Sequence, residues 1–195
     1  IGDRALHYYL SQLVDLGYLR RRYPLTGRPP VPRHVRYELD DPLLRFWFRF
    51  VYPNTSYLLR AGPEKTFQER VRPDLDGYFG SCFERLCREA LPFLYLREGV
   101  SRDFEVGEYW DRRVQIDVVG VRKDGRTDLG ECRWGRVAGA PALVRELEEK
   151  SALFPNPLGA TLARRIFTRG KPPRLQESRL GVRWHDLEDL YRAAK

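Results

Sequence analysis

Between residues 104 and 133, three stretches of the sequence have apolar side chains at alternate positions. This spacing constrains the fold more than any other feature. Residues 104–110, 113–121 and 127–133 each show the alternation, which predicts three strands. The stretch Lys123-Asp124-Gly125-Arg126 carries an Asp-Gly turn signal, so the second and third strands are predicted to form a hairpin. This segment therefore predicts a β-sheet, and the flanking sequence indicates which elements pack on it.

Helical spacing flanks these strands. A helix is predicted over residues 76–91, where Pro92 ends it because proline lacks the backbone N–H that a continuing helix needs. The elements predicted after the three strands are a helix over 141–154, strands over 162–168 and 182–184, and a helix that begins at 185. This order predicts an α/β (α+β) domain over residues 76–195, with a mixed sheet flanked by helices.

Residues 1–40 are predicted to be part of a winged helix. A helix over 3–16 ends at Gly17, and two basic strands, 18–23 and 34–39, flank a loop rich in proline and glycine. In the DNA-binding form of this module the wing contacts backbone phosphate. The candidate nucleic-acid-binding residues are Arg20, Arg21, Arg22, Arg28, Arg33 and Arg36. Many winged helices bind proteins instead, and the first helix carries little positive charge, so both functions stay open.

A helical connector is predicted over residues 41–75. Asp41 and Pro42 form a helix start, since proline is tolerated in the first turn. The apolar run over 43–52 predicts a buried helix, because it is too short for a membrane span and is interrupted by arginines.

The composition is that of a globular protein, with 195 residues of which 42% are hydrophobic. The formal net charge is +8, yet residues 76–134 carry a net −2 between basic flanks, which suits a protein that attracts phosphate and gathers carboxylates at one site. Three cysteines without C-x-x-C spacing and no targeting segment predict a reducing, cytoplasmic location away from membranes. The chain starts at Ile1 and contains no methionine, which predicts a fragment of a longer protein.

Two carboxylates on neighbouring predicted strands are the candidate chemical site. Glu131 and Arg133 share a face of one strand, and Asp117 lies on the strand before it. A hairpin loop of three or five residues places Asp117 opposite Glu131, whereas a two-residue turn pairs Asp117 with Cys132 and separates the carboxylates. Two carboxylates beside a cation suit Mg²⁺ and phosphate. The alternative is a surface hairpin whose outer face carries ordinary charged residues.

Four segments of the sequence resemble known families. Residues 110–119 and 130–134 resemble the signature of the PD-(D/E)xK nuclease superfamily. Residues 41–54 and 78–89 resemble the C-terminal region of archaeal-type P-loop ATPases, the domain-of-unknown-function family 234. The resemblance implies a restriction-endonuclease-like fold and an ATPase domain upstream in the same protein. An upstream position for the ATPase agrees with the 195-residue sequence, in which no G-x-x-x-x-G-K-[ST] loop occurs.

The resemblance also implies a chemistry. Asp117 and Glu131 would bind Mg²⁺ or Mn²⁺, Glu84 would assist them, and Arg133 would stabilise charge during hydrolysis of a phosphodiester, with DNA as the expected nucleic acid. Arg133 departs from the pattern, because the family usually has lysine there and a planar guanidinium does not replace a compact ammonium. The alternative is a non-catalytic regulatory or protein-interaction domain with a degenerate nuclease fold.

A further basic run follows the fourth predicted strand of the sheet. It consists of Arg164, Arg165, Arg169, Lys171 and Arg174. Such a run either faces DNA or forms a solvated edge of the sheet, and the solvated edge is the default expectation.

Overall fold

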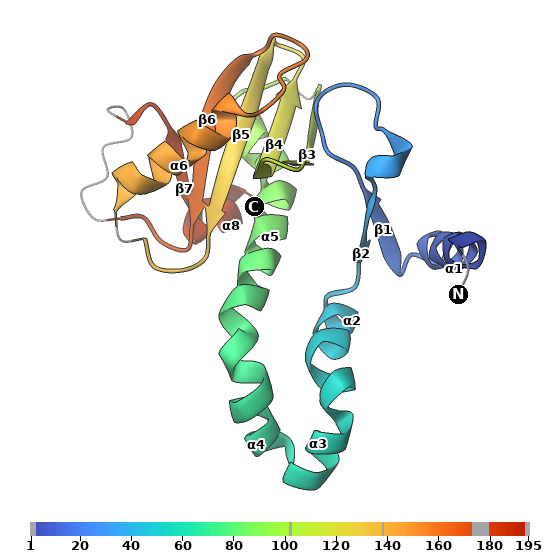
Figure 1. The fold of residues 1–195 in the computed structure, drawn as a ribbon. Coiled ribbons are helices and arrows are strands. Elements are labelled where there is room, and N and C mark those ends of the chain that lie inside the picture. Colours follow the sequence, from blue (N-terminus) through green and yellow to red (C-terminus); the bar gives the residue numbers. More distant parts are fainter. Residues whose placement is uncertain (1–2, 102, 138, 173–179, 194–195) are drawn as a thin grey trace. The chain divides into compact units, whose positions relative to one another are not determined.

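The computed structural model describes residues 3–101, 103–137, 139–172 and 180–193. The chain divides into two compact units. One contains residues 1–23 and 31–75, and the other contains residues 24–30 and 76–195. Figure 1 follows the chain through both.

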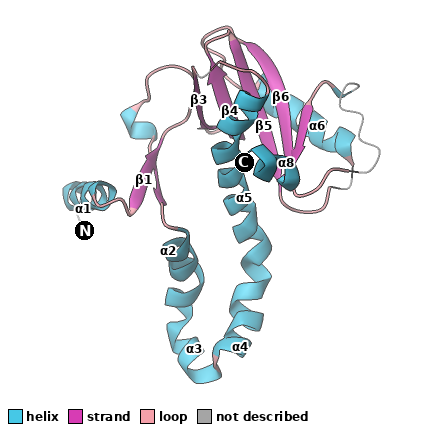
Figure 2. Cartoon of the chain, turned by 180° about the vertical axis from the view of Figure 1, so that it is seen from behind, coloured by secondary structure: helices cyan, strands magenta, loops and turns pink. Residues whose placement is uncertain are grey.

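The larger unit is built on a mixed five-stranded sheet with the order β3-β4-β5-β6-β7. The first three strands are antiparallel neighbours, and β6 and β7 each run parallel to the strand before them. Figure 2 shows this sheet from behind. Its strands are β3 (Phe104–Trp110), β4 (Gln115–Arg122), β5 (Arg126–Arg133), β6 (Thr161–Thr168) and β7 (Arg183–Asp186). The sequence prediction of a mixed sheet is confirmed.

Helices cover both faces of this sheet. The helix α6 (Ala140–Ala152) packs Leu143 and Leu147 into one apolar cluster with Ile166 of β6. On the other face, α5 (Leu75–Arg97) and α8 (Leu187–Ala193) contribute to a second cluster around Phe167. The unit therefore has three layers, which is how a sheet without a solvated face buries both sets of side chains.

The predicted end of α5 at Pro92 is wrong. The helix continues through this proline to Arg97. Leu94 and Tyr95, which follow the proline, are 4% and 0% exposed and pack against the sheet. Burial of such side chains contributes about 2 kcal/mol each, which offsets the roughly 3 kcal/mol that proline costs inside a helix.

The loop over residues 24–30 belongs to the larger unit and lies along the edge strand β3. The backbone N–H of Leu25 donates to the carbonyl of Glu108 at 2.7 Å, and Pro24 forms an isolated parallel bridge with the same residue. The side chain of Leu25 packs over Gly107, where a Cβ would lie only 3.2 Å away from it. The loop thus covers part of an otherwise open sheet edge.

The smaller unit contains a helix, a hairpin and a series of short helices. The strands β1 (Leu19–Arg22) and β2 (Arg36–Leu39) pair antiparallel, as predicted. The helices are α1 (Asp3–Asp15), α2 (Pro42–Phe46), α3 (Thr55–Ala61) and α4 (Pro63–Thr66), with 3₁₀ turns at Pro32–His34, Tyr52–Asn54 and Arg72–Asp74 and π turns at Trp47–Val51 and Phe67–Val71. The prediction of a buried helix over 43–52 is wrong, since Phe50 is its one buried residue while Leu43 is 71% exposed.

A membrane-crossing helix would need a long apolar stretch. Within the described ranges, no helix of the chain meets that requirement.

Candidate functional site

The hairpin between β4 and β5 has the register that brings the two carboxylates together. Residues 123–125 form its loop, in which Gly125 has a φ of +81°. Val121 pairs with Thr127 and Val118 pairs with Gly130. Continued by one residue, this register places Asp117 opposite Glu131. The loop has three residues, one of the lengths that a joint site requires, and the two-residue turn that would separate the carboxylates is excluded.

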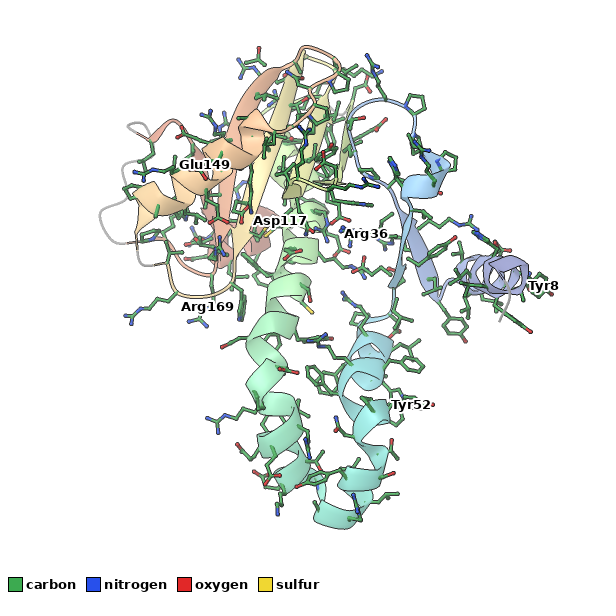
Figure 3. All side chains as sticks on the ribbon, viewed as in Figure 1. Tyr8, Arg36, Tyr52, Asp117, Glu149 and Arg169 are labelled. Carbon is green, nitrogen blue, oxygen red and sulfur yellow. The ribbon has the colours of Figure 1, made fainter. Side chains whose placement is uncertain are left out.

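Both carboxylates are buried. Asp117 is 7% exposed and Glu131 is 3% exposed. A carboxylate oxygen of Asp117 accepts a hydrogen bond from the backbone N–H of Cys132 at 3.0 Å, and Arg88 of α5 donates to the Asp117 carbonyl at 2.8 Å. Figure 3 places Asp117 on the sheet of the larger unit. The alternative of an ordinary charged surface on the hairpin does not describe side chains buried to this extent.

Helix α6 supplies the cation that lies closest to this pair. The ammonium of Lys150 is 2.6 Å from one oxygen of Glu131 and 3.2 Å from Glu146. The guanidinium of Arg133 lies 3.3 Å from the other oxygen of Glu131 and 2.6 Å from Glu146. Glu131 is therefore held between an ammonium from a helix and a guanidinium from its own strand.

Lys150 and Glu146 are absent from the residues expected from sequence. Their spacing of four on a predicted helix was visible, and such a pair is ordinary on an exposed helix face. Only the packing of α6 on the face of β5 that carries Glu131 brings them to the carboxylates.

The electrostatics of the pair differ from those of isolated carboxylates. Burial, together with the charge of Asp117, raises the pKa of Glu131 to about 7, although Lys150 opposes the change. Burial also raises the pKa of Asp117, against the hydrogen bond from the Cys132 N–H. Burial alone would lower the pKa of Lys150, but its contact with Glu131 raises it. Burial is thus the largest cause of both raised pKa values, and the cations beside the pair oppose it only in part.

The donor chemistry of the pair fits Mg²⁺ or Mn²⁺. Magnesium is commonly held by one or two carboxylates and several waters, so two opposed carboxylates are enough. Within the part of the chain that the structure describes, no group of three or more His, Cys, Asp or Glu side chains could hold a metal. Glu84 of α5 therefore does not complete a three-ligand site with Asp117 and Glu131, and its charge acts on the buried Cys132 thiol.

The arginines expected to bind nucleic acid are dispersed among different partners. Arg20 pairs with Asp40 at 2.7 Å, and Arg22 pairs with Glu38 at 2.6 Å. The other candidates are Arg21, which donates to Ser11, Arg28, which donates to the carbonyl of Pro157, and Arg33 and Arg36, which are exposed. Arg20 and Arg22 are thus partly neutralised by carboxylates within the smaller unit.

The basic run after the fourth predicted strand is not a uniformly solvated edge. Arg165 is 1% exposed, so the default expectation is wrong for this residue. Arg169 lies over the ring of Trp134 at 5.5 Å, which makes Trp134 a partner of a cation as well as a packing residue. Lys171 pairs with Asp189 at 2.8 Å, and Arg174 lies outside the described residues.

The larger unit is a mixed α/β domain with a buried acidic pair on two adjacent strands of its sheet. Residues 47–149 match the DUF234 family, described as archaeal and bacterial proteins of unknown function, and this match covers more than half of the chain. The protein belongs to the DUF234 family.

One relative and one solved structure extend the comparison. The chain is 27% identical over 150 residues to the uncharacterized protein MJECL04 of Methanocaldococcus jannaschii, a match that covers 74% of this chain and 33% of the relative. The chain thus spans about a third of the length of that archaeal relative. The crystal structure of protein VC1899 from Vibrio cholerae aligns with a TM-score of 0.40 at 14% identity, covering 98% of this chain and 41% of that one.

Proposed function

We propose that the larger unit is a restriction-endonuclease-like domain that hydrolyses phosphodiester bonds of nucleic acid, DNA in the first place, with Mg²⁺ or Mn²⁺. The order helix, three antiparallel strands, helix and parallel strand, which α5 through β6 follow, supports this assignment. The resemblance of residues 110–134 to the PD-(D/E)xK signature supports it as well. In this proposal the chain serves an ATPase domain of the same protein, in keeping with a relative of which the matched residues are only 33%.

The observation that carries the proposal is the hairpin register, which continued by one residue sets Asp117 opposite Glu131, with the Lys150 ammonium 2.6 Å from Glu131. Two buried carboxylates and an ammonium on one side of a sheet are costly to place together. The raised pKa of Glu131 reflects that cost. Such an arrangement is typical of a site that uses its charges in chemistry, and here it coincides with the residues of the nuclease signature.

Each residue has a role that follows from its position. Asp117 and Glu131 would hold the divalent cation, which when bound polarises the scissile phosphate and makes water a better nucleophile. Lys150 can move its ammonium from Glu131 to a phosphate oxygen, because its side chain is 26% exposed and flexible. Arg133, 41% exposed, can hold a second phosphate oxygen with its guanidinium. The hydrogen bond from the Cys132 N–H keeps the Asp117 carboxylate in place.

A nicking assay tests this function. Supercoiled plasmid and single-stranded DNA are incubated with the chain and Mg²⁺ or Mn²⁺, with EDTA as the blank. Asp117→Asn and Lys150→Met are expected to lose activity, whereas Glu149→Gln, an exposed change on the same helix as Lys150, is expected to retain it. Equal nicking by the wild type and by Asp117→Asn would show that a contaminant or another site cuts the DNA.

A second function has its own supporting observation. Both oxygens of Glu131 already contact cations, and one of these is Arg133 in place of the usual lysine. A pair neutralised in this way suits a non-catalytic regulatory or protein-interaction domain with a degenerate nuclease fold. Arg133→Lys separates the two functions, because it restores the usual residue. An increase in nicking supports the nuclease, and metal-binding calorimetry without heat at millimolar Mg²⁺ or Mn²⁺ supports the non-catalytic domain.

A further inference from the structure

Arginines line a cavity of about 510 Å³ at the hairpin end of the sheet. Arg122 ends β4 and Arg126 begins β5, whereas Asp117 lies toward the start of β4. The cavity is thus separate from the carboxylate pair. Its charged lining consists of Arg122, Arg126, Arg164, Arg165 and Arg183, with Asp128.

Arg165 and Asp128 of the lining belong to a network of ion pairs and hydrogen bonds that also includes Glu98 and Tyr95. Arg165, 1% exposed, donates to Asp128 at 2.8 Å and makes two hydrogen bonds to Glu98, at 2.6 and 2.7 Å. Asp128 also accepts a hydrogen bond from the hydroxyl of the buried Tyr95 at 2.6 Å. Asp128 accepts a further hydrogen bond from Arg122 at 3.4 Å, so the one carboxylate that lines the cavity is already paired with two guanidiniums.

Two other guanidiniums of the lining each have one donor without a partner in the described part of the chain. The terminal nitrogens of Arg122 pair with Asp124 and with Asp128, and its Nε is buried without an acceptor among the described residues. The Nε of Arg164 is also buried without an acceptor among the described residues. A terminal nitrogen of the same guanidinium lies 3.6 Å from Glu148. Arg126 is exposed and forms no ion pair with any residue that the structure describes. Buried N–H groups are rarely left without acceptors, because each costs its lost hydration.

The remaining charge of the cavity is positive. Five guanidiniums line it, and even with the carboxylates that lie around it, Glu98, Asp124 and Glu148, the acidic groups stay one short of the basic ones. Arginine presents a planar fork of donors that matches two oxygens of a phosphate at once. The volume lies in the range of about 300–1,000 Å³ that is usual for small-molecule sites.

We propose that this cavity binds phosphate groups of a nucleotide-sized ligand, as a second site at the end of the sheet away from Asp117 and Glu131. Arg126, which forms no ion pair with a described residue, and Arg164 supply the donors for the ligand, and the ion-paired Arg122 and Arg165 hold the strands beside them. The ligand is either a free nucleoside polyphosphate or the phosphorylated end of a nucleic-acid strand, since both present clustered phosphate oxygens. Binding at this site does not require the hydrolysis proposed for the carboxylate pair.

Calorimetric titration of the whole chain with inorganic pyrophosphate tests the site. The expected result is saturable binding of one pyrophosphate per chain, weakened about tenfold or more by Arg126→Ala and by Arg164→Ala. Both changes remove partly or wholly exposed side chains, so the fold is kept. Arg145→Ala removes an exposed arginine of α6 outside the cavity and is expected to leave the affinity unchanged. No saturable binding, or an equal loss in all three variants, would overturn the proposal.

Two further arms identify the source of the phosphate and separate this site from the proposed nuclease. ATP and a 5′-phosphorylated single-stranded 12-mer compete against pyrophosphate, with the unphosphorylated 12-mer as the matched control. Stronger competition by ATP assigns a free nucleotide, and stronger competition by the phosphorylated 12-mer assigns a strand end. Competition by neither overturns the assignment to nucleotides. Asp117→Asn is expected to bind pyrophosphate as the wild type does, so a failure of the nuclease leaves this site standing.

Discussion

Ionisation of Glu131 is expected to destabilise the folded chain as the pH rises, and Glu131→Gln is expected to remove this effect. The pKa of Glu131 is raised to about 7, from an ordinary value of 4.5, by burial and by the charge of Asp117. A carboxyl whose folded-state pKa is raised favours folding below pH 4.5, and this contribution disappears as the pH rises through 7. Because one pKa unit corresponds to about 1.4 kcal/mol, the loss amounts to about 3 kcal/mol.

The free energy of unfolding of the wild type does not show this loss by itself, because the titration of His185 changes it in the opposite direction. Burial and the charge of Arg165 lower the pKa of His185 from 6.5 to about 4. A histidine with a lowered folded-state pKa adds stability as the pH rises toward 6.5, and the amount is again about 3 kcal/mol. The two contributions largely cancel between pH 5 and pH 8. The difference between Glu131→Gln and the wild type removes the contribution of His185, since both proteins contain it.

The assay is urea unfolding followed by tryptophan fluorescence at pH 5, 6, 7 and 8, in EDTA. The free energy of unfolding of Glu131→Gln, minus that of the wild type, is expected to rise by about 2.5 kcal/mol across this range, since part of the loss already occurs below pH 5. Glu149→Gln changes the same charge at an exposed position and is expected to give a constant difference. A difference for Glu131→Gln that stays level from pH 5 to pH 8 would refute the raised pKa. At pH 8, added Mg²⁺ is expected to stabilise the wild type and not Glu131→Gln.

Three further outcomes follow from single contacts. Gly120→Ala places a Cβ 2.0 Å from the hydroxyl of the buried Tyr95, so a loss of about 2 to 3 kcal/mol in urea unfolding is expected, and a midpoint unchanged from wild type would contradict the close packing. The imidazole of His185 is expected to stay neutral in NMR titrations down to about pH 5, and a midpoint near 6.5 would show that it is solvated. Lys150→Met removes the charge that opposes protonation of Glu131. The pKa of Glu131, followed by ¹³C NMR, is therefore expected to rise above 7 in this variant, and a fall would contradict the ion pair between the two residues.

Local patterns in the sequence were sufficient for the strands, and they limited the hairpin register to a few alternatives. The alternation over residues 104–133 predicts β3, β4 and β5, and the Asp124-Gly125 pair restricts the loop between the last two to a few lengths. The parity of that length decides whether Asp117 faces Glu131, so a short-range feature determines a longer-range contact. The helix end at Pro92 was wrong because proline acts locally, whereas Leu94 and Tyr95 are held by the sheet.

Three features can be predicted from the sequence because each depends on residues close together in it. They are the order of the elements, the acidic pair and the replacement of lysine by Arg133. The charges that surround the pair cannot, because Lys150 lies 19 residues from Glu131 and reaches it through the packing of α6 on the sheet. The arginine-lined cavity has the same origin. Its guanidiniums come from β4, β5, β6 and β7. The hairpin joins β4 to β5, but β6 and β7 reach them only through parallel pairing of strands that are distant in the sequence. Periodicity states which side chains share a face, and packing decides which faces meet.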